Sequence, residues 1–170
     1  VLVYAKIPNA KSGTCTITCE TFNGSTSLGT STCTMSVTTS STACKPTVSG
    51  TVVDTNTTTV ALTGDNTTLI RYKSTAVCTI SATAKNSATI SAKTINDSFV
   101  TSTKTYTNVN VSSFKFAATD SRGYSSSYTV TPTVIPYIQL TLNPIVQRPL
   151  PTTGEVTLSF NGNFYNGNLG

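Results

Sequence analysis

Hydrophobic and polar residues alternate with a period of two over most of this chain. The run TCTITCE (residues 14–20) and the run TCTMSVT (residues 32–38) place apolar or sulfur-bearing side chains at every second position. Alternation of this kind in a threonine-rich sequence predicts half-buried β-strands. The stretch between them contains the turn signal Asn-Gly, so we expect a β-hairpin. Its predicted inner face consists of Cys15, Ile17, Cys19, Cys33, Met35 and Val37.

Shorter strands are predicted at close intervals through the middle of the chain. In the run SSFKFAATD (residues 112–120), two phenylalanines and an alanine share one face. In the turn that follows, Asp120 can accept backbone hydrogen bonds and Gly123 can adopt a positive φ. The strand candidates are residues 51–55, 59–62, 74–84, 88–95, 98–111, 112–120 and 126–134. Their number and spacing are typical of an immunoglobulin-like β-sandwich, although the absence of tryptophan argues against an antibody-type domain.

The strand pattern predicts an all-β fold of tandem immunoglobulin-like β-sandwich domains. We expect residues 47–136 to form a complete sandwich, whereas residues 1–46 and 137–170 have room for only two or three strands each. So few strands rarely bury enough apolar surface to be stable alone. The two shorter segments are therefore predicted to be the C-terminal part of one such domain and the N-terminal part of another. Either a longer chain or strands of neighbouring copies would complete them.

The composition agrees with a folded β-protein. The 170 residues are 37% hydrophobic and only 10% charged, and serine and threonine make up roughly a third of them. Long runs of the strong helix formers are absent. A chain so rich in serine and threonine can also be a disordered, mucin-like stalk. The period-two pattern and the small number of prolines favour the folded interpretation.

The chain carries a net charge of +5, from 11 basic and 6 acidic residues. The basic residues are scattered, without the aromatic residues between them that a nucleic-acid surface needs, so we expect no nucleic-acid binding. A weak attraction to anionic cell-wall polymers is compatible with this charge. No apolar stretch approaches the ~20 residues of a membrane-spanning helix, and no membrane insertion is expected.

The five cysteines leave three interpretations open. On one strand, Cys15 and Cys19 lie about 13 Å apart at ~3.3 Å per residue, too far to bridge or to share a metal ion. They can be small buried hydrophobic residues, which we favour, or one of them can form a cross-strand disulfide with Cys33. A zinc site is least favoured, because the chain has no histidine and no CxxC motif. An odd number of cysteines fits a protein made in a reducing cytoplasm.

Residues with catalytic or metal-binding chemistry are sparse. Without histidine, the chain lacks the commonest general base and metal ligand. Most of the six carboxylates lie at predicted turns, and Asp54 and Asp65 can share a sheet edge. The loops TGDNTT and DSRG contain oxygen ligands but not the spaced series of a strong calcium site. We therefore expect no enzyme activity, no cofactor and no metal ion.

Tyrosines are the candidate binding residues. A set of four can form a sugar-stacking surface or, in the interpretation we favour, close the core at strand ends: Tyr124, Tyr128, Tyr137 and Tyr165. Within this set, Tyr124 and Tyr128 are the candidates for contact with carbohydrate.

Several stretches carry a family resemblance that spans almost the whole chain. They are the ordered series DSRGY, VIPY and RPLPTTGEVTLSFNGNFYNG, with AKIPNAKSGTCTITCETFNGSTSLGTSTCTMSVT and KPTVSGTVVDTNTTTVALTGDNTTLIRYKSTA. The chain resembles the immunoglobulin-like repeats of tail-associated structural proteins in siphoviruses of Gram-positive hosts. The resemblance implies a non-enzymatic module of a virion tail, tail tip or fibre, made in the host cytoplasm, that spaces or supports receptor-binding elements.

The expected partners follow from that resemblance. They are other virion tail proteins, further copies of this chain in a homo-oligomer, and host cell-wall carbohydrate. Alternatives remain open at this point: a bacterial surface adhesin of tandem immunoglobulin-like domains, a carbohydrate-binding module, or the non-catalytic repeat of a wall-directed enzyme.

Overall fold

The computed structural model describes residues 3–147, 154 and 156–168. Strands form most of its secondary structure, which confirms the predicted all-β class. The chain divides into two compact units. Unit 1 comprises Val1–Thr51, Cys78–Lys104 and Phe114–Val130, and unit 2 comprises Val52–Val77, Thr105–Ser113 and Thr131–Gly170. The arrangement as tandem immunoglobulin-like sandwiches, with boundaries after residues 46 and 136, stays a prediction.

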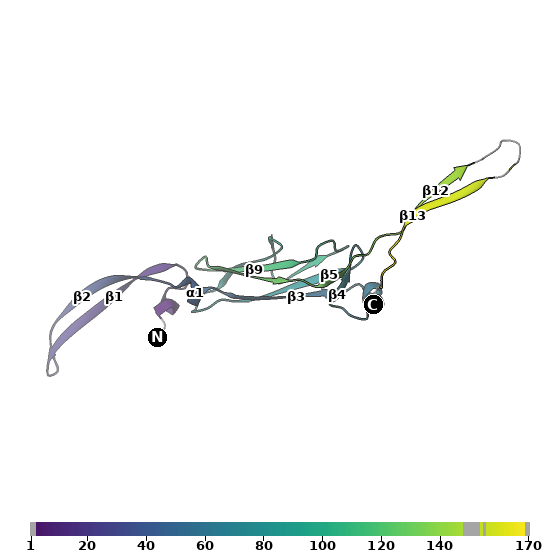
Figure 1. Ribbon diagram of the computed structural model, residues 1–170. Coiled ribbons are helices and arrows are strands. Elements are labelled where there is room, and N and C mark those ends of the chain that lie inside the picture. The colour runs from purple at the N-terminus through teal and green to yellow at the C-terminus, as the bar shows by residue number, and fades with distance from the viewer. Residues whose placement is uncertain (1–2, 148–153, 155, 169–170) are drawn as a thin grey trace. The chain divides into compact units, whose positions relative to one another are not determined.

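The elements follow one another along the chain as labelled in Figure 1. The first strands are β1 (Ser12–Asn23), β2 (Thr26–Thr38), β3 (Thr47–Asp54), β4 (Thr68–Ile70), β5 (Ala76–Thr83), β6 (Ile90–Ile95) and β7 (Ser98–Phe99). The later strands are β8 (Thr103–Tyr106), β9 (Phe114–Asp120), β10 (Ser125–Val130), β11 (Thr133–Ile135), β12 (Thr141–Gln147) and β13 (Thr157–Asn163). The helical turns are η1 (Val3–Lys6), α1 (Ser41–Cys44) and α2 (Thr57–Thr63).

The strands of the described residues pair in small sheets. One sheet has the order β10-β9-β6-β7 and lies in unit 1, and a second has the order β3-β5-β8. In unit 2, β11 pairs in parallel with β4. The remaining pairs are the antiparallel hairpins β1–β2 and β12–β13.

The core of unit 1 follows the predicted alternation. Phe114, Phe116 and Ala118 of β9 are buried on one face, as the sequence pattern predicts. Opposite them, a Cβ atom at Gly50 of β3 would lie 2.5 Å from the Phe116 ring, so only glycine fits there. In β5, Cys78 is also fully buried. The close packing of β3 against the Phe116 ring therefore depends on a missing side chain.

Residues 59–62, predicted as a strand, belong instead to the helix α2. Asn56 caps its N-terminus by accepting a hydrogen bond from the Thr58 backbone nitrogen at 3.0 Å. Gly64 ends it in the left-handed conformation with φ of 67°, which glycine adopts without strain. The two caps outweigh the strand preference of the threonines and Val60.

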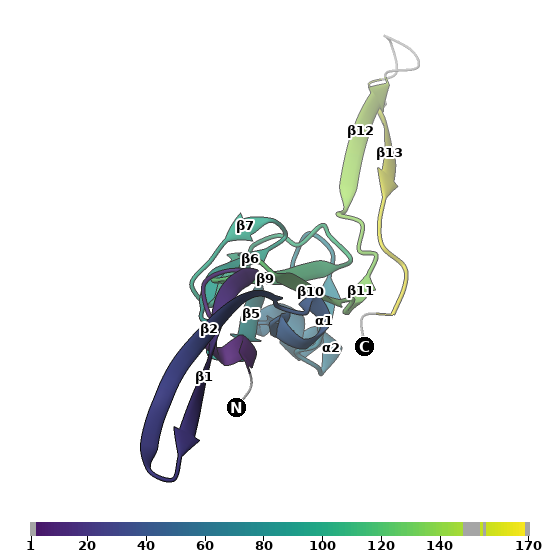
Figure 2. The same ribbon diagram turned by 90° about the vertical axis from the view of Figure 1, so that its left-hand side faces the viewer.

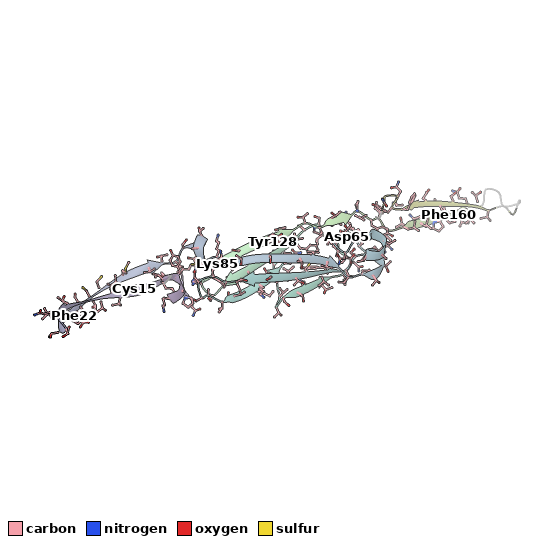
Figure 3. All side chains as sticks on the ribbon, turned by 90° about the horizontal axis from the view of Figure 1, so that it is seen from below. Cys15, Phe22, Asp65, Lys85, Tyr128 and Phe160 are labelled. Atoms are coloured by element: carbon pink, nitrogen blue, oxygen red, sulfur yellow. The ribbon has the colours of Figure 1, made fainter. Side chains whose placement is uncertain are left out.

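The predicted N-terminal hairpin is confirmed, but its expected burial is wrong. Cys15 pairs with Met35 and Ile17 pairs with Cys33, so the apolar and sulfur-bearing residues share one face. Beyond its base, where Cys15 and Val37 are half-buried, that face is open: Ile17 is 51% exposed, and Cys33 is exposed as well. The opposite face carries serine and threonine together with Glu20 and, near the turn, Phe22. Figures 1 and 2 show β1 and β2 extending from the rest of unit 1, and Figure 3 shows their side chains.

The base of this hairpin is fastened to the β9–β10 turn. The Tyr124 hydroxyl donates to the Thr39 carbonyl oxygen at 2.9 Å, just after β2. The Thr39 nitrogen donates to the Lys11 carbonyl oxygen at 2.8 Å, just before β1. Ser121 donates through its hydroxyl to the Pro8 carbonyl oxygen at 2.6 Å. The hairpin is thus fixed at one end and open along its length.

The hairpin β12–β13 has the same two-faced character. Its register pairs Pro144 with Phe160 and Val146 with Leu158 on one face, whereas the other face carries polar residues and Ile145. The apolar face is open to solvent, with Phe160 63% exposed (Figure 3). An isolated two-stranded hairpin is only marginally stable in water. Both hairpins therefore present apolar surface that the described chain does not cover.

Candidate ligand-binding site

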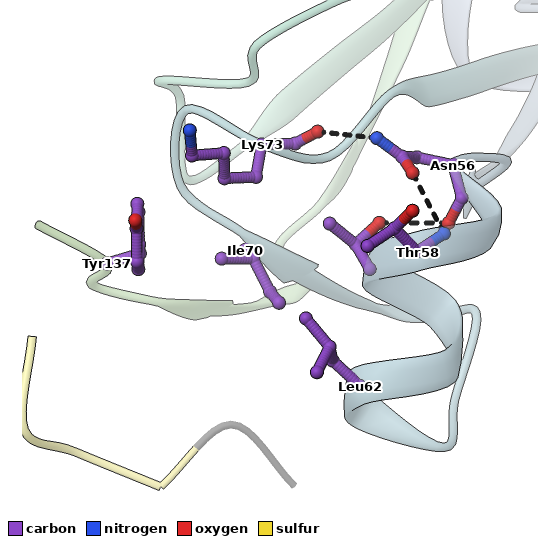
Figure 4. A pocket seen from close by; sticks show the side chains of 7 residues that line it. Asn56, Thr58, Leu62, Ile70, Lys73 and Tyr137 are labelled. Carbon is purple, nitrogen blue, oxygen red and sulfur yellow. Dashed lines mark hydrogen bonds between the residues drawn. The ribbon is translucent and has the colours of Figure 1, made fainter. Parts of the chain in front are cut away.

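A pocket of about 440 Å³ lies in unit 2 beside α2 (Figure 4). Three segments that are distant in sequence form its walls. The lining residues are Asn56, Thr58, Thr59, Leu62, Ile70, Lys73 and Tyr137. The volume falls within the range of ~300–1,000 Å³ that small-molecule sites occupy.

The buried carboxylate of Asp54 holds two of these segments together. Its Oδ2 accepts hydrogen bonds from the hydroxyls of Thr59 and Ser74, each at 2.5 Å. Its Oδ1 accepts from the backbone nitrogens of Asn56 and Thr75, each at 3.0 Å. The bond from Asn56 is the local backbone contact expected of an aspartate at a turn. The others fix the start of α2 against the turn that precedes β5.

The Asn56 side chain continues this link at the pocket wall. Its Nδ2 donates to the Lys73 carbonyl oxygen at 2.9 Å, while its Oδ1 caps α2. Both interactions are drawn in Figure 4. The backbone of Lys73 is therefore held in place, and its side chain is left to extend along the pocket.

The Lys73 ammonium lies against an aromatic wall. Its Nζ is 5.4 Å from the centroid of the Tyr137 ring, within cation–π range. The Tyr165 ring packs on Tyr137 at a centroid distance of 5.9 Å and an interplanar angle of 56°. With the described carboxylates, Lys73 makes no ion pair. In Figure 4, Tyr137 and Lys73 stand on one side of Ile70 and Leu62 on the other.

This combination of groups offers both apolar and polar contacts to a ligand. Leu62 and the tyrosine ring offer apolar surface, and Thr58 and Lys73 offer polar groups. The carboxylate of Asp54, which accepts a hydrogen bond from Thr59 of the same lining, is enclosed by four hydrogen bonds.

The tyrosines proposed from the sequence lie elsewhere, in unit 1. Tyr124 is half-buried and uses its hydroxyl to hold Thr39, and the Lys11 ammonium lies 5.2 Å from its ring centroid. Tyr128 is 46% exposed on the edge strand β10 (Figure 3). Of the four tyrosines considered, it is Tyr137 and Tyr165 that the structure brings together. The pocket lined by Tyr137 could not be predicted from the sequence, because Asn56 and Lys73 are 17 positions apart along the chain and Lys73 and Tyr137 are 64 positions apart.

The candidate cation loops form local hydrogen bonds. The Asp65 carboxylate accepts from the Thr67 backbone nitrogen at 2.8 Å and from its hydroxyl at 2.7 Å. These bonds from Thr67, followed by one from the Thr68 hydroxyl, lower the pKa of the Asp65 carboxyl. In the second loop, Asp120 accepts from the backbone nitrogens of Arg122 and Tyr124. Among the described residues, no three His, Cys, Asp or Glu side chains are grouped as a metal site.

The cysteines, all of them within the described residues, are free thiols. Cys33 stands opposite Ile17 rather than opposite Cys15 or Cys19, and the cross-strand disulfide that was the alternative interpretation is not formed. The interpretation as buried hydrophobic residues is wrong for Cys19 and Cys33, which are exposed. It does describe Cys78, where burial raises the pKa of the thiol to about 11.

The fold and these contacts define an all-β protein with two open hairpins and a pocket suited to ligand binding. The chain belongs to a family of siphovirus proteins: the family model described as "Siphovirus protein of unknown function (DUF859)" matches residues 3–161. Comparisons with curated proteins and with solved structures give no significant match. The phage origin implied by the sequence resemblance is thus confirmed at the level of the family.

No helix among the described residues has the length and apolar character needed to cross a membrane.

Proposed function

We propose that this chain is a non-enzymatic structural and adhesion module of a siphovirus tail, tail tip or fibre. In this role its immunoglobulin-like sandwiches space or support the elements that bind the host receptor. The observation that carries the proposal is the pair of hairpins, β1–β2 and β12–β13, each with one open apolar face. Contiguous exposed apolar surface is typical of protein–protein contact sites. Membership of a siphovirus protein family supports a place in the virion.

The partner proposed for the β1–β2 hairpin is the same hairpin of a second copy of this chain. Most homo-oligomers are symmetric, so the same element of each copy meets its counterpart at the axis. The apolar face around Ile17 carries no charged residue, and like copies would not repel one another there. Burying the Ile17 face would also supply the packing that a two-stranded hairpin lacks.

The remaining roles in the proposal are contact with host wall carbohydrate and the absence of catalysis. The net charge of +5 favours anionic wall polymers. The buried carboxylates of Asp54 and Asp120 are engaged in hydrogen bonds within the fold, a structural use that supports a non-enzymatic role.

The location in the virion can be tested on purified particles of a siphovirus that encodes this chain. We expect mass spectrometry to find the protein in isolated tails after their separation from capsids, and antibody labelling to mark the tail in electron micrographs. Empty capsids from the same preparation are the control. Recovery of the protein only from the host lysate, or only from the bacterial surface, would overturn the proposal.

A further inference from the structure

The pocket in unit 2 combines features that point to a particular ligand chemistry. Leu62 and the Tyr137 ring form an apolar surface, to which Ile70, only 2% exposed, adds little, and the Lys73 ammonium lies at its edge. Pyranose rings present one face of C–H groups that packs on such a surface, while their hydroxyls need hydrogen-bonding partners. Thr58 supplies a hydroxyl in the same lining.

The cation in the pocket lacks an anionic partner within the described protein. The ion pairs of the described residues join Lys115 to Asp97 and Arg122 to Asp120, and neither includes Lys73. Cation–π contact with Tyr137 orients the ammonium but does not neutralise it. A ligand with an acidic group could therefore gain a charge-assisted hydrogen bond that a neutral sugar could not.

We propose that this pocket binds a saccharide unit that carries a carboxylate or a phosphate. The sugar ring packs against Tyr137 and Leu62, and the acidic group contacts the Lys73 ammonium. Tyr165 supports the ring of Tyr137 from outside the lining. The Asn56 side chain donates a hydrogen bond to the Lys73 carbonyl oxygen. This bond fixes the backbone from which the Lys73 side chain extends. The inference rests on the proposed function, because such units would be met in the anionic polymers of a host wall.

The proposal can be tested with three small sugars and the full 170-residue chain. Saturation-transfer NMR and calorimetric titration with glucose 6-phosphate, glucuronic acid and glucose give the affinity for each. We expect at least one of the two acids to bind about tenfold or more tightly than glucose. A preference for the first acid indicates a phosphate-bearing wall polymer, and a preference for the second indicates a uronic-acid polymer. If neither acid binds more tightly than glucose, the proposal is overturned.

Variants assign the binding to this pocket. Lys73→Gln keeps the backbone acceptor for Asn56 and should remove the preference for the acid. Tyr137→Leu should weaken binding of the acid at least fivefold while leaving an apolar wall. Tyr128→Ala, on β10 in unit 1, and Lys93→Gln, on β6, are the matched controls and should bind as the unchanged protein does. Thermal unfolding of each variant checks that it folds.

The result for sugar binding in the pocket can be distinguished from the result for the proposed tail function. Acid binding that survives Lys73→Gln and Tyr137→Leu, or is lost in Tyr128→Ala, would overturn the assignment to the pocket. Presence of the protein in isolated tails is measured without any sugar, so the tail role can hold when the pocket fails.

Discussion

At the scale of single residues, Arg122 connects two separate segments of unit 1 to the β9–β10 turn. Its Nε donates to the Ile7 carbonyl oxygen at 2.7 Å, and its Nη1 donates to that of Lys85 at 2.9 Å. Its Nη2 donates to the carbonyl oxygens of Tyr4 at 2.9 Å and Asn86 at 2.5 Å. Asp120 lies 3.6 Å from Nη1, and both side chains are fully buried. The guanidinium thus donates hydrogen bonds to four backbone carbonyl oxygens of two segments.

Removing this side chain should destabilise unit 1 strongly. Arg122→Ala leaves the Asp120 carboxylate buried without its cation, and breaking a buried pair in this way costs about 3–5 kcal/mol. The matched control is Lys115→Ala, which removes the exposed ion pair with Asp97 at 3.5 Å. Exposed pairs contribute at most about 1 kcal/mol. Urea unfolding followed by circular dichroism measures the free energy of unfolding of both variants. Equal losses would contradict the stabilising role of the buried Arg122 side chain.

Cys78 should make the stability of the protein depend on alkaline pH. Its thiol is buried, and its pKa rises from 9.0 to about 11. In the unfolded chain the thiol loses its proton near pH 9, whereas the native thiol keeps it, so deprotonation favours unfolding. The contribution is fully present below pH 9 and is lost between about pH 9 and 11.

Unfolding midpoints measured at pH 8, 9, 10 and 11 check this expectation. Cys78→Ala, which cannot ionise, should lose less stability over that interval than the unchanged protein does. If both proteins lose the same stability over that pH interval, ionisation of Cys78 is not the cause.

The sequence identified some residue environments and missed others for physical reasons. The alternation in β9 gave the buried face of Phe114, Phe116 and Ala118 correctly, because that strand has one covered face. Tyr124 was a candidate for carbohydrate contact, but its hydroxyl holds the Thr39 carbonyl oxygen. That partner is 85 residues away and has no signature in the sequence.

At the scale of elements, α2 shows how end signals override local propensity. Its seven residues include four threonines and a valine, which favour strands. The helix forms because Asn56 caps it, Gly64 ends it and Asp54 binds the hydroxyl of Thr59 from outside the element. Asn and Gly are common at helix ends, a signal that the strand prediction for residues 59–62 did not use, whereas the contact with Asp54 has no signature in the sequence.

The hairpin β1–β2 shows a different limit of pattern analysis. The alternation predicted which residues share a face, and the register confirms it. A period of two does not contain information about what covers that face. Ile17 therefore has the sequence context of a core residue and the exposure of a surface residue.

A charge on the apolar face of β1–β2 should disrupt association between copies. Ile17→Lys places an ammonium on the face that we propose to be buried in the oligomer. The control Thr16→Lys places the same group on the polar face of the same strand. We expect Ile17→Lys to reduce the mass measured by size exclusion with light scattering toward that of one chain, 17.8 kDa. Thr16→Lys should leave the mass of the oligomer unchanged.

The exposed thiol of Cys33 gives a second measurement of the same contact. If the apolar faces meet, mild oxidation should link copies through Cys33 or Cys19, and Ile17→Lys should reduce that linking. A protein that is monomeric at all concentrations, and that does not cross-link, would contradict the contact.

At the scale of the whole molecule, the all-β class and the N-terminal hairpin were predictable, and the pocket was not. Local patterns predict strands because the polarity of each residue indicates which face of the strand it occupies. The pocket is formed by Asn56, Lys73 and Tyr137, which are brought together by tertiary contacts. Its clearest structural cause, the hydrogen bonds of Asp54 to Ser74 and Thr59, also joins residues that are up to 20 positions apart.

The contacts of Arg122 also have a consequence for the order in which the chain is assembled. Tyr4 and Ile7 are synthesised before Arg122, and the guanidinium that donates to their carbonyl oxygens is 118 and 115 residues further on. Closing so long a loop has a large entropic cost, and contacts of this separation slow folding. On the ribosome, the segment with Tyr4 and Ile7 lacks these hydrogen bonds until Arg122 has emerged. This segment is thus among the last parts of unit 1 to reach its native position.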